Sequence, residues 1–189
     1  LTRFIDSQAG GSTDTDDRLM LLKKLLPTPL GPMLAVASDE GLCGLEFDLP
    51  DRATRLWSRL RRWGAGTEAA DGHAAVFDAA REWLDAYFSS AARRGPAVAL
   101  DLRGTEFERA VWREIQAIQA GRTTTYGDIA ATLDRRDAAR AVGAAVGANP
   151  VSLIVPCHRV VGLDGGLTGY GGGLPRKEWL LRHEGVLLL

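Results

Sequence analysis

The sequence predicts an α+β protein with a mixed N-terminal domain and a mostly helical C-terminal domain. Between residues 19 and 48, short apolar runs alternate with Pro and Gly turns, which is typical of antiparallel strands. Beyond residue 104, apolar side chains recur mainly at helical spacing. The 189 residues are 46% hydrophobic and 25% charged, which is the composition of an ordinary globular chain with room for a sizeable core.

The N-terminal half begins with a polar segment. Residues 1–18 are rich in Gly, Ser and Asp and have no periodicity, so we expect a flexible tail. The N-terminal domain is expected over residues 19–103, where the runs "LMLLKKLL", "MLAVAS" and "LCGLEFD" read as a meander of antiparallel strands. Cys43 lies in the third run, and we interpret it as a small buried hydrophobic side chain.

Two helices and one more strand complete this domain. Residues 51–63 and 74–88 each carry an aromatic and aliphatic stripe at helical spacing, which usually marks core packing. His73, at the start of the second helix, has no partner motif and is expected on the surface. The run "AVALDL" at 97–102 is expected to form a strand, and a domain boundary follows near residues 101–105.

The C-terminal domain, residues 104–189, reads as a series of helices. The first is expected at 106–118, and Thr125 with Asp128 forms a capping-box pattern at the start of the second. Asp137 is the expected cap of a third helix, so that two short helices follow one another in a helix-turn-helix pattern. Pro175 suits the first position of a last helix that ends at Gly185.

Charge and cysteine usage exclude several classes of protein. The formal net charge is -1, so any nucleic-acid binding needs a local basic patch. Two cysteines cannot form a disulfide framework, which favours the reducing cytoplasm. No apolar run reaches the roughly 18 residues of a membrane span, and the N-terminus lacks a signal-peptide pattern.

The stretch "IVPCHRVVG" raises three alternatives for Cys157: a core residue, a metal ligand or a nucleophile. A structural zinc site needs about four ligands, and the two Cys and three His are scattered, so no metal is expected. A core strand rarely continues from Pro-Cys into His-Arg, whereas a nucleophilic thiol needs an adjacent base or positive charge. His158 can supply the base and Arg159 the positive charge, and Glu184 is a candidate to orient His158.

The segments "NPVSLIVPCHRVVG" and "LTGYGGGLPRKEWLLRHEG" closely resemble the O6-alkylguanine-DNA alkyltransferases, also called methylated-DNA–protein-cysteine methyltransferases. The resemblance extends to "TYGDIA", "AARAVGAAVGANP" and, more loosely, "TPLGPMLAVASDEGLCGLEFD", and so covers roughly residues 20–187. It implies a ribonuclease H-like N-terminal domain and a winged-helix-like C-terminal domain. It also implies DNA repair by transfer of the alkyl group of O6-alkylguanine, with O4-alkylthymine as a second candidate, to the protein's own cysteine.

The resemblance assigns the catalytic roles residue by residue. Cys157 accepts the alkyl group, His158 takes the thiol proton through a water, and Glu184 orients His158. Asn149 braces the turn that precedes the active cysteine. The thioether product is stable, so one molecule reacts once, and no cofactor is implied.

A second set of residues is implied in binding DNA and the flipped base. Tyr126 would crowd the target phosphate and donate to guanine N3, and Arg140 would fill the gap in the base stack from the minor groove. Tyr170 would cover the base, while backbone groups near Val160 and Gly171 would read its edge.

The expected partner is alkylated duplex DNA, bound by a monomer with no membrane involved. Only three arginines accompany the helix-turn-helix, namely Arg135, Arg136 and Arg140, so the salt dependence of DNA binding should be shallow.

Three departures from the family pattern stand out. Gly171 replaces a common Ser, Gln119 replaces a common Pro, and the zinc-binding set of some relatives is absent. Since Ser152 and Gly171 are both small, the pocket should accept alkyl groups larger than methyl.

Three rival functions remain. A damage-recognition protein without transfer would lack the cysteine. A Cys-His enzyme acting on small molecules would leave Tyr126 and Arg140 unused. A purely structural DNA-binding module would carry an unreactive Cys157.

Overall fold

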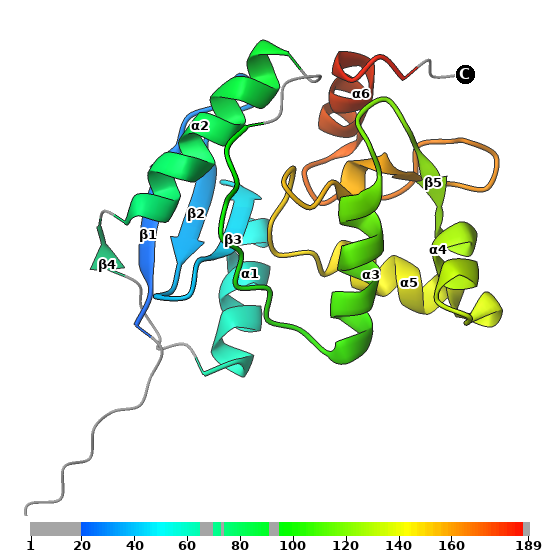
Figure 1. The fold of residues 1–189 in the computed structure, drawn as a ribbon, viewed down its shortest axis with the longest axis horizontal. Helices are drawn as coiled ribbons and strands as arrows, with labels where there is room; N and C mark the ends of the chain where they lie inside the picture. The colour runs from blue at the N-terminus through cyan, green and yellow to red at the C-terminus, as the bar shows by residue number, and fades with distance from the viewer. Residues whose placement is uncertain (1–19, 65–69, 73, 91–94, 187–189) are drawn as a thin grey trace, which may run out of the picture.

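The fold is known from a computed structural model, which describes residues 20–64, 70–72, 74–90 and 95–186. The expected tail at residues 1–18 and His73 lie outside the described residues. The chain forms a sheet-containing half and a helical half, which lie side by side (Figure 1). This arrangement confirms the predicted α+β fold.

The sheet of the first half contains four strands in the order β3-β2-β1-β4. The strands and their two helices are β1 (Leu22–Leu26), β2 (Met33–Ala37), β3 (Leu42–Phe47), α1 (Pro50–Arg62), β4 (Ala70–Asp71) and α2 (Ala75–Ser89). The first three strands pair antiparallel, as the meander pattern predicted, and β4 pairs parallel with β1.

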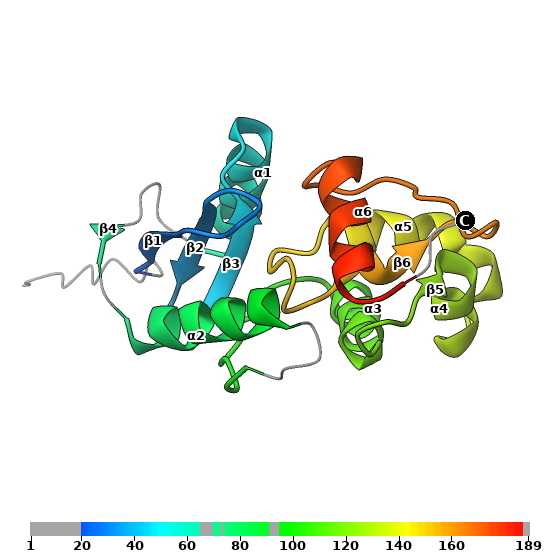
Figure 2. The same cartoon turned by 90° about the horizontal axis from the view of Figure 1, so that it is seen from above.

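One helix covers each face of this sheet (Figure 2). Side chains alternate between the faces along β2, because successive residues of a strand point in opposite directions. Val36 shares a buried cluster with Leu56 of α1, whereas Ala35 shares a second cluster with Phe77 of α2. Both faces are therefore buried along β2 and β3, which explains why these two strands are almost continuously apolar.

The second half consists of four α-helices and short connecting elements. These are α3 (Glu106–Ala117), β5 (Thr124–Thr125), α4 (Tyr126–Thr132), η1 (Arg136–Ala138), α5 (Ala139–Gly147), η2 (Cys157–Arg159), β6 (Val160–Val161) and α6 (Leu174–His183). The capping box of α4 forms as predicted, and α3 begins with a second one, in which Thr105 and Glu108 bond each other's backbone N–H. Beyond the end of α6, Gly185 adopts a φ of 80°, which glycine tolerates best.

Two local predictions were wrong. Asp137 does not cap α5, because it lies inside the 3₁₀ turn η1, and α5 starts after Ala138 without a side-chain cap. The segment 97–102 is not a strand, because only Leu100 forms a bridge, with Leu42 of β3. The rest of β3 on that side pairs with a more distant segment.

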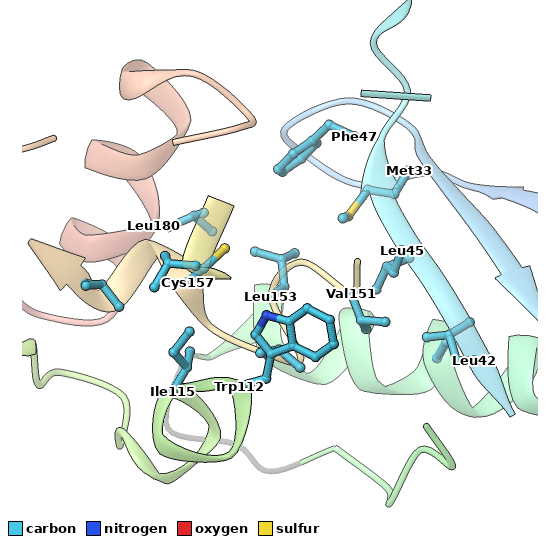
Figure 3. Close-up of a cluster of buried hydrophobic side chains, with 14 of the residues drawn as sticks. Met33, Leu42, Leu45, Phe47, Trp112, Ile115, Val151, Leu153, Cys157 and Leu180 are labelled. Carbon is cyan, nitrogen blue, oxygen red and sulfur yellow. The ribbon is translucent and has the colours of Figure 1, made fainter. Parts of the chain in front are cut away.

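That distant segment, Pro150 to Ser152, joins the two halves. The Leu45 N–H donates to the Pro150 carbonyl at 2.9 Å, and the Ser152 N–H donates to the Leu45 carbonyl at 2.7 Å. Figure 3 shows Val151 lying close to Leu45 of β3. One buried cluster therefore contains side chains from both halves of the chain.

Trp112 of α3 is the largest fully buried side chain of this shared cluster. Its indole N–H donates to the Ala145 carbonyl of α5 at 2.9 Å, so its one polar atom is satisfied. This contact fixes α5 against α3. Within the described part of the chain, no helix is long and apolar enough to cross a bilayer.

Replacing Thr105 with Ala should lower the free energy of unfolding by about 1 kcal/mol, because α3 loses its N-cap. Chemical denaturation followed by circular dichroism would measure the change. Thr54→Ala is the matched control, since Thr54 is exposed within α1. Equal stability of the Thr105 variant and the wild type would contradict the proposed contribution of the cap.

Candidate active site

Cys157 begins a 3₁₀ turn at the end of a loop that starts next to the sheet. Asn149, itself buried, holds this loop at two points. Its Nδ2 donates to the Val155 carbonyl at 2.8 Å, and its Oδ1 accepts from the Val151 N–H at 3.0 Å. The asparagine thus stabilises the path of the chain into Cys157, which is the geometry expected of a brace.

Cys157 lines a cavity of about 290 Å³ that opens toward α4 and α5, the two helices of the expected helix-turn-helix. The cysteine is 9% exposed and lies at the margin of the shared core, where Figure 3 places it near Leu153 and Leu180. The cavity is lined by Arg52, Arg55, Tyr126, Gly143, Val146, Gly147, Ser152, Cys157, Gly169, Tyr170 and Gly171. The structure therefore brings Tyr126, Tyr170 and Gly171 together with Cys157.

His158 is fully buried beside Cys157, and its ring is held by Glu184. Nε2 of His158 lies 2.8 Å from Oε1 of Glu184. The other ring nitrogen, Nδ1, is buried and has no hydrogen-bond partner among the described residues. No direct hydrogen bond joins the described His158 and Cys157 side chains, so Nδ1 is the nitrogen left for proton transfer.

Glu184 accepts hydrogen bonds from both halves of the protein. Arg159 donates to it through Nε and Nη2, each at 2.8 Å, and the hydroxyl of Tyr87 donates to Oε1 at 2.8 Å. Burial alone would raise the pKa of Glu184, but the hydrogen bonds and charges of His158 and Arg159 lower it to about 2. The carboxylate is ionised at neutral pH as a result.

The positive charge of Arg159 therefore compensates the negative charge of Glu184. Arg159 is not free to activate Cys157, although its charge and its position in the sequence made it a candidate. Its guanidinium is 10% exposed and also donates to the Ile118 carbonyl. Burial lowers the pKa of His158, and the hydrogen bond to Glu184 opposes this shift. His158 is consequently a neutral imidazole whose Nε2–H donates to Glu184, which leaves Nδ1 as an acceptor.

The thiol of Cys157 is protonated in this structure. Burial raises its pKa to about 11, while a hydrogen bond from Asn149 lowers it, Glu46 raises it, and the charges of Arg52 and Lys177 lower it. The resting site therefore lacks thiolate character, because desolvation outweighs the positive neighbours. Cys43, buried as predicted, has its pKa raised to about 12.

Arg52 of α1 lies against the glycine that replaces the common Ser. It pairs with the buried Glu46, whose Oε2 lies 3.2 Å from Nε of Arg52. A Cβ added at Gly171 would lie 2.3 Å from Cζ of Arg52, so a side chain there would displace the guanidinium. The glycine makes room for an arginine from the other half of the chain.

Three of the residues expected to bind DNA or the flipped base lie outside the cavity lining. Val160 is buried, and its carbonyl accepts from Nζ of the fully buried Lys177 at 2.6 Å. Arg140 is exposed in the first turn of α5. The guanidinium of Arg135 lies over the ring of Phe107, 5.5 Å from its centroid.

Sequence reasoning missed Tyr87, Arg52 and Lys177. Tyr87 was part of an aromatic stripe interpreted as core, and the spacing of Arg52 from other arginines on one helix face was the available signal. Among the described residues, no group of three or more His, Cys, Asp or Glu side chains could hold a metal ion.

A buried thiol with a histidine-carboxylate pair, facing a helix-turn-helix, defines a protein that combines DNA binding with cysteine nucleophile chemistry. Residues 21–102 match the family described as 6-O-methylguanine DNA methyltransferase, ribonuclease-like domain, and residues 106–186 match its DNA binding domain. A methylated-DNA–protein-cysteine methyltransferase of Salmonella typhimurium is 44% identical over 90% of this chain and 99% of its own. The chain belongs to this methyltransferase family.

Solved structures agree with this assignment. A Mycobacterium tuberculosis OGT in complex with DNA superposes with a TM-score of 0.72 at 37% identity, covering 86% of this chain and 92% of its own. The O6-methylguanine-DNA methyltransferase of Pyrococcus kodakaraensis superposes with a TM-score of 0.64 at 28% identity, covering 88% and 100%. The family resemblance seen in the sequence is thus confirmed.

Replacing Glu184 with Gln should remove a pH-dependent contribution to stability. Because the folded pKa is lowered from 4.5 to about 2, the ionised carboxylate stabilises the protein above pH 4.5, and this contribution is lost as the pH falls toward 2. The wild type should therefore exceed the variant by on the order of 3 kcal/mol near neutrality, and the difference should shrink on acidification.

Urea denaturation at a series of pH values would measure this difference. Glu178→Gln is the matched control, because Glu178 pairs with Arg182 on the exposed face of the same helix. A constant difference between wild type and Glu184→Gln from neutral to acid pH would show that Glu184 is not the group described.

Proposed function

We propose that this protein repairs O6-alkylguanine in duplex DNA by transferring the alkyl group irreversibly to its own Cys157. The observation that carries the proposal is the position of Cys157 in a cavity whose wall includes Tyr126 and Gly143 of the helix-turn-helix. A thiol in that position can be reached from a DNA molecule bound to α4 and α5. Family membership supplies the reaction class.

The target base must leave the duplex to reach Cys157. The cysteine is 9% exposed, so a base stacked within DNA cannot approach its sulfur. A cavity of about 290 Å³ is large enough for a guanine ring. Base flipping is the step that brings the alkylated O6 beside the thiol.

The transfer starts from a neutral thiol and a neutral imidazole. His158 Nδ1 takes the proton of Cys157 through a bridging water, and the sulfur attacks the alkyl carbon as the bond to O6 breaks. The electron pair of that bond passes to guanine, whose negative charge Tyr126 stabilises by donating to N3. Glu184 and Arg159 hold His158 as it becomes an imidazolium.

The remaining roles concern the DNA and the rim of the pocket. Arg140 fills the gap left by the flipped base and approaches from the minor groove, and Arg135 contacts the backbone after leaving the ring of Phe107. Tyr170 covers the base, and Gly171 offers its N–H to the base edge. Asn149 keeps the active loop in place. Val160 contributes through its backbone, although its carbonyl also accepts from Lys177.

The width of the pocket supports transfer of groups larger than methyl. Ser152 and Gly171 both line the cavity, and neither fills much space. We propose that the protein acts as a monomer in the cytoplasm, because the site is complete within one chain and both cysteines are free thiols.

Mixing the protein with a duplex that carries one O6-methylguanine should add one methylene, about 14 Da, to the Cys157 peptide and stop at one per chain. Intact-protein and peptide mass spectrometry would detect it. Cys157→Ala should gain nothing, and Cys43→Ala should react as the wild type does, because Cys43 lies in the separate α1-facing cluster.

A solvent-reactive Cys157 that gains no mass from this duplex would instead favour thiol chemistry on small molecules. An inert Cys157 would favour a structural cysteine.

Replacing Tyr87 with Phe should slow the transfer by about tenfold, because the carboxylate that orients His158 loses a hydrogen bond. The negative charge of Glu184 is then less compensated and stabilises the protonated form of His158 more strongly, so the pKa of His158 rises. The acid limb of the pH–rate profile should move to higher pH, which a loss of stability alone would not cause.

Single-turnover rates across the acid range would test both effects. Ser89→Ala on the same helix is the control, since its hydroxyl bonds only the Ala86 carbonyl. An unshifted pH profile for Tyr87→Phe would remove Tyr87 from the catalytic network.

A further inference from the structure

Helix α1 carries a row of arginines along the side that lies next to the helical half. Arg52, Arg55, Arg59 and Arg62 follow one another at spacings of three, four and three residues, which places them on one side of a helix. Leu60 and other apolar residues of α1 pack against the sheet on the adjacent side of the helix. The arginines therefore face the helical half of the protein.

These arginines line a groove of about 470 Å³ between α1 and the C-terminal end of α5, here called the α1–α5 groove. Its lining comprises Glu46, Arg52, Thr54, Arg55, Leu56, Ser58, Arg59, Arg62, Ala144, Gly147, Ala148, Asn149 and Pro150. Four of these side chains are cationic and one is anionic. The α5 side is formed by small residues, and a Cβ added at Gly147 would meet nothing within 4 Å.

The charges of the groove are only partly compensated. Glu46 pairs with Arg52, and Glu108 accepts from Nη2 of Arg59 at 2.9 Å. Arg55 and Arg62 are exposed and have no ion-pair partner among the residues that the structure describes. Two positive charges therefore face the solvent across the groove.

Arg59 adds a buried donor to the floor of the groove. Its guanidinium stacks over Trp112 at 5.4 Å from the ring centroid, and the side chain is 9% exposed. Nη1 of Arg59 is buried and has no acceptor among the described residues. A buried guanidinium N–H without an acceptor is costly, so an anion that reached it would be stabilised.

The groove is continuous with the cavity of Cys157. Arg52, Arg55 and Gly147 line both. Any molecule that places a base in the cavity therefore extends close to Arg55. Along α5, Arg140 and Gly147 are separated by seven residues or about 10 Å, which matches about three base-pair steps of DNA.

We propose that the α1–α5 groove binds phosphodiester groups of the DNA whose flipped base enters the Cys157 cavity, so that the N-terminal half is a second DNA-contacting surface. The proposal rests on the proposed function. Arginine forks suit phosphate oxygens, and the helix-turn-helix itself carries few cations. Arg55 and Arg62 make the contacts at the groove mouth, and Arg59 supplies positive charge from below.

The test compares two double variants that each remove two positive charges from the N-terminal half. The groove variant, Arg55→Ala/Arg62→Ala, removes the two exposed positive charges at the mouth of the groove. Arg61→Ala/Arg81→Ala is the control, because Arg61 bonds only Ser58 and Arg81 pairs with Asp85 on α2. Binding of unmodified duplex is measured by fluorescence anisotropy at several salt concentrations, after thermal melting has shown that both variants fold.

The slope of log K against log salt should become shallower by about 1 to 2 in the groove variant, since each phosphate contact contributes about 0.9. The control variant should keep the wild-type slope. Equal slopes in all three proteins would overturn the proposal. An equal decrease of the slope in both variants would also overturn the proposal. Such a result would show that the overall charge of the protein matters and that the groove is not a specific binding site.

Neutral methylphosphonate linkages, placed one at a time around the lesion, provide the second readout. At one or two positions they should weaken binding of the wild type severalfold and leave binding of the groove variant unchanged, as expected when both changes remove the same contact. Additive losses at every position would contradict a direct contact.

Mass spectrometry separates this proposal from the proposed function. If the wild type acquires the methyl group but the groove and control variants bind DNA alike, the groove proposal is contradicted and the proposed repair function stands. If the wild type acquires no methyl group but its salt slope differs from that of the groove variant as predicted, the proposed repair reaction is contradicted. The groove would then remain as a DNA-binding site.

Discussion

The carboxylate of Glu184 is the interaction on which the active site depends. It receives donors from α2, from the turn that contains Cys157, and from Gly121, whose N–H lies 3.4 Å from Oε2. A buried carboxylate is unfavourable unless its oxygens are saturated with donors, and here both oxygens are. Because Tyr87 belongs to the N-terminal half, the packing of the two halves contributes to the orientation of the catalytic histidine. The N-terminal half thus contributes directly to the geometry of the site.

The charge balance around this carboxylate explains why the reactive cysteine stays unmodified until substrate binds. Arg159 neutralises Glu184, and burial keeps both His158 and Cys157 uncharged at rest. A thiol is a much weaker nucleophile than a thiolate, so stray electrophiles in solution find little reactivity. Proton transfer proceeds once an electrophilic carbon lies next to the sulfur, because the thiolate is consumed by bond formation as it forms. Reactivity is then coupled to the arrival of substrate.

Much of this site was predictable because its residues sit in local sequence patterns. Cys157 and His158 are neighbours in a specific motif, and the Thr125 capping box depends on four consecutive residues. Tyr87 is 97 residues from Glu184, and its apolar neighbours in α2 gave it the pattern of a core residue. Arg52 was likewise hidden, because only the fold brings it to Gly171. Contacts of this kind depend on tertiary packing, which a single sequence does not reveal.

The pairing of β3 with residues 150–152 has a consequence for the solubility of parts of this protein. A strand with a free edge exposes backbone donors and acceptors that can pair with another chain and start aggregation. In this fold the loop that leads to Cys157 occupies the open side of β3, together with residues 99–101. The segment that shapes the active site therefore also shields an apolar sheet. A fragment cut after this half of the chain would expose β3 and would be prone to self-association.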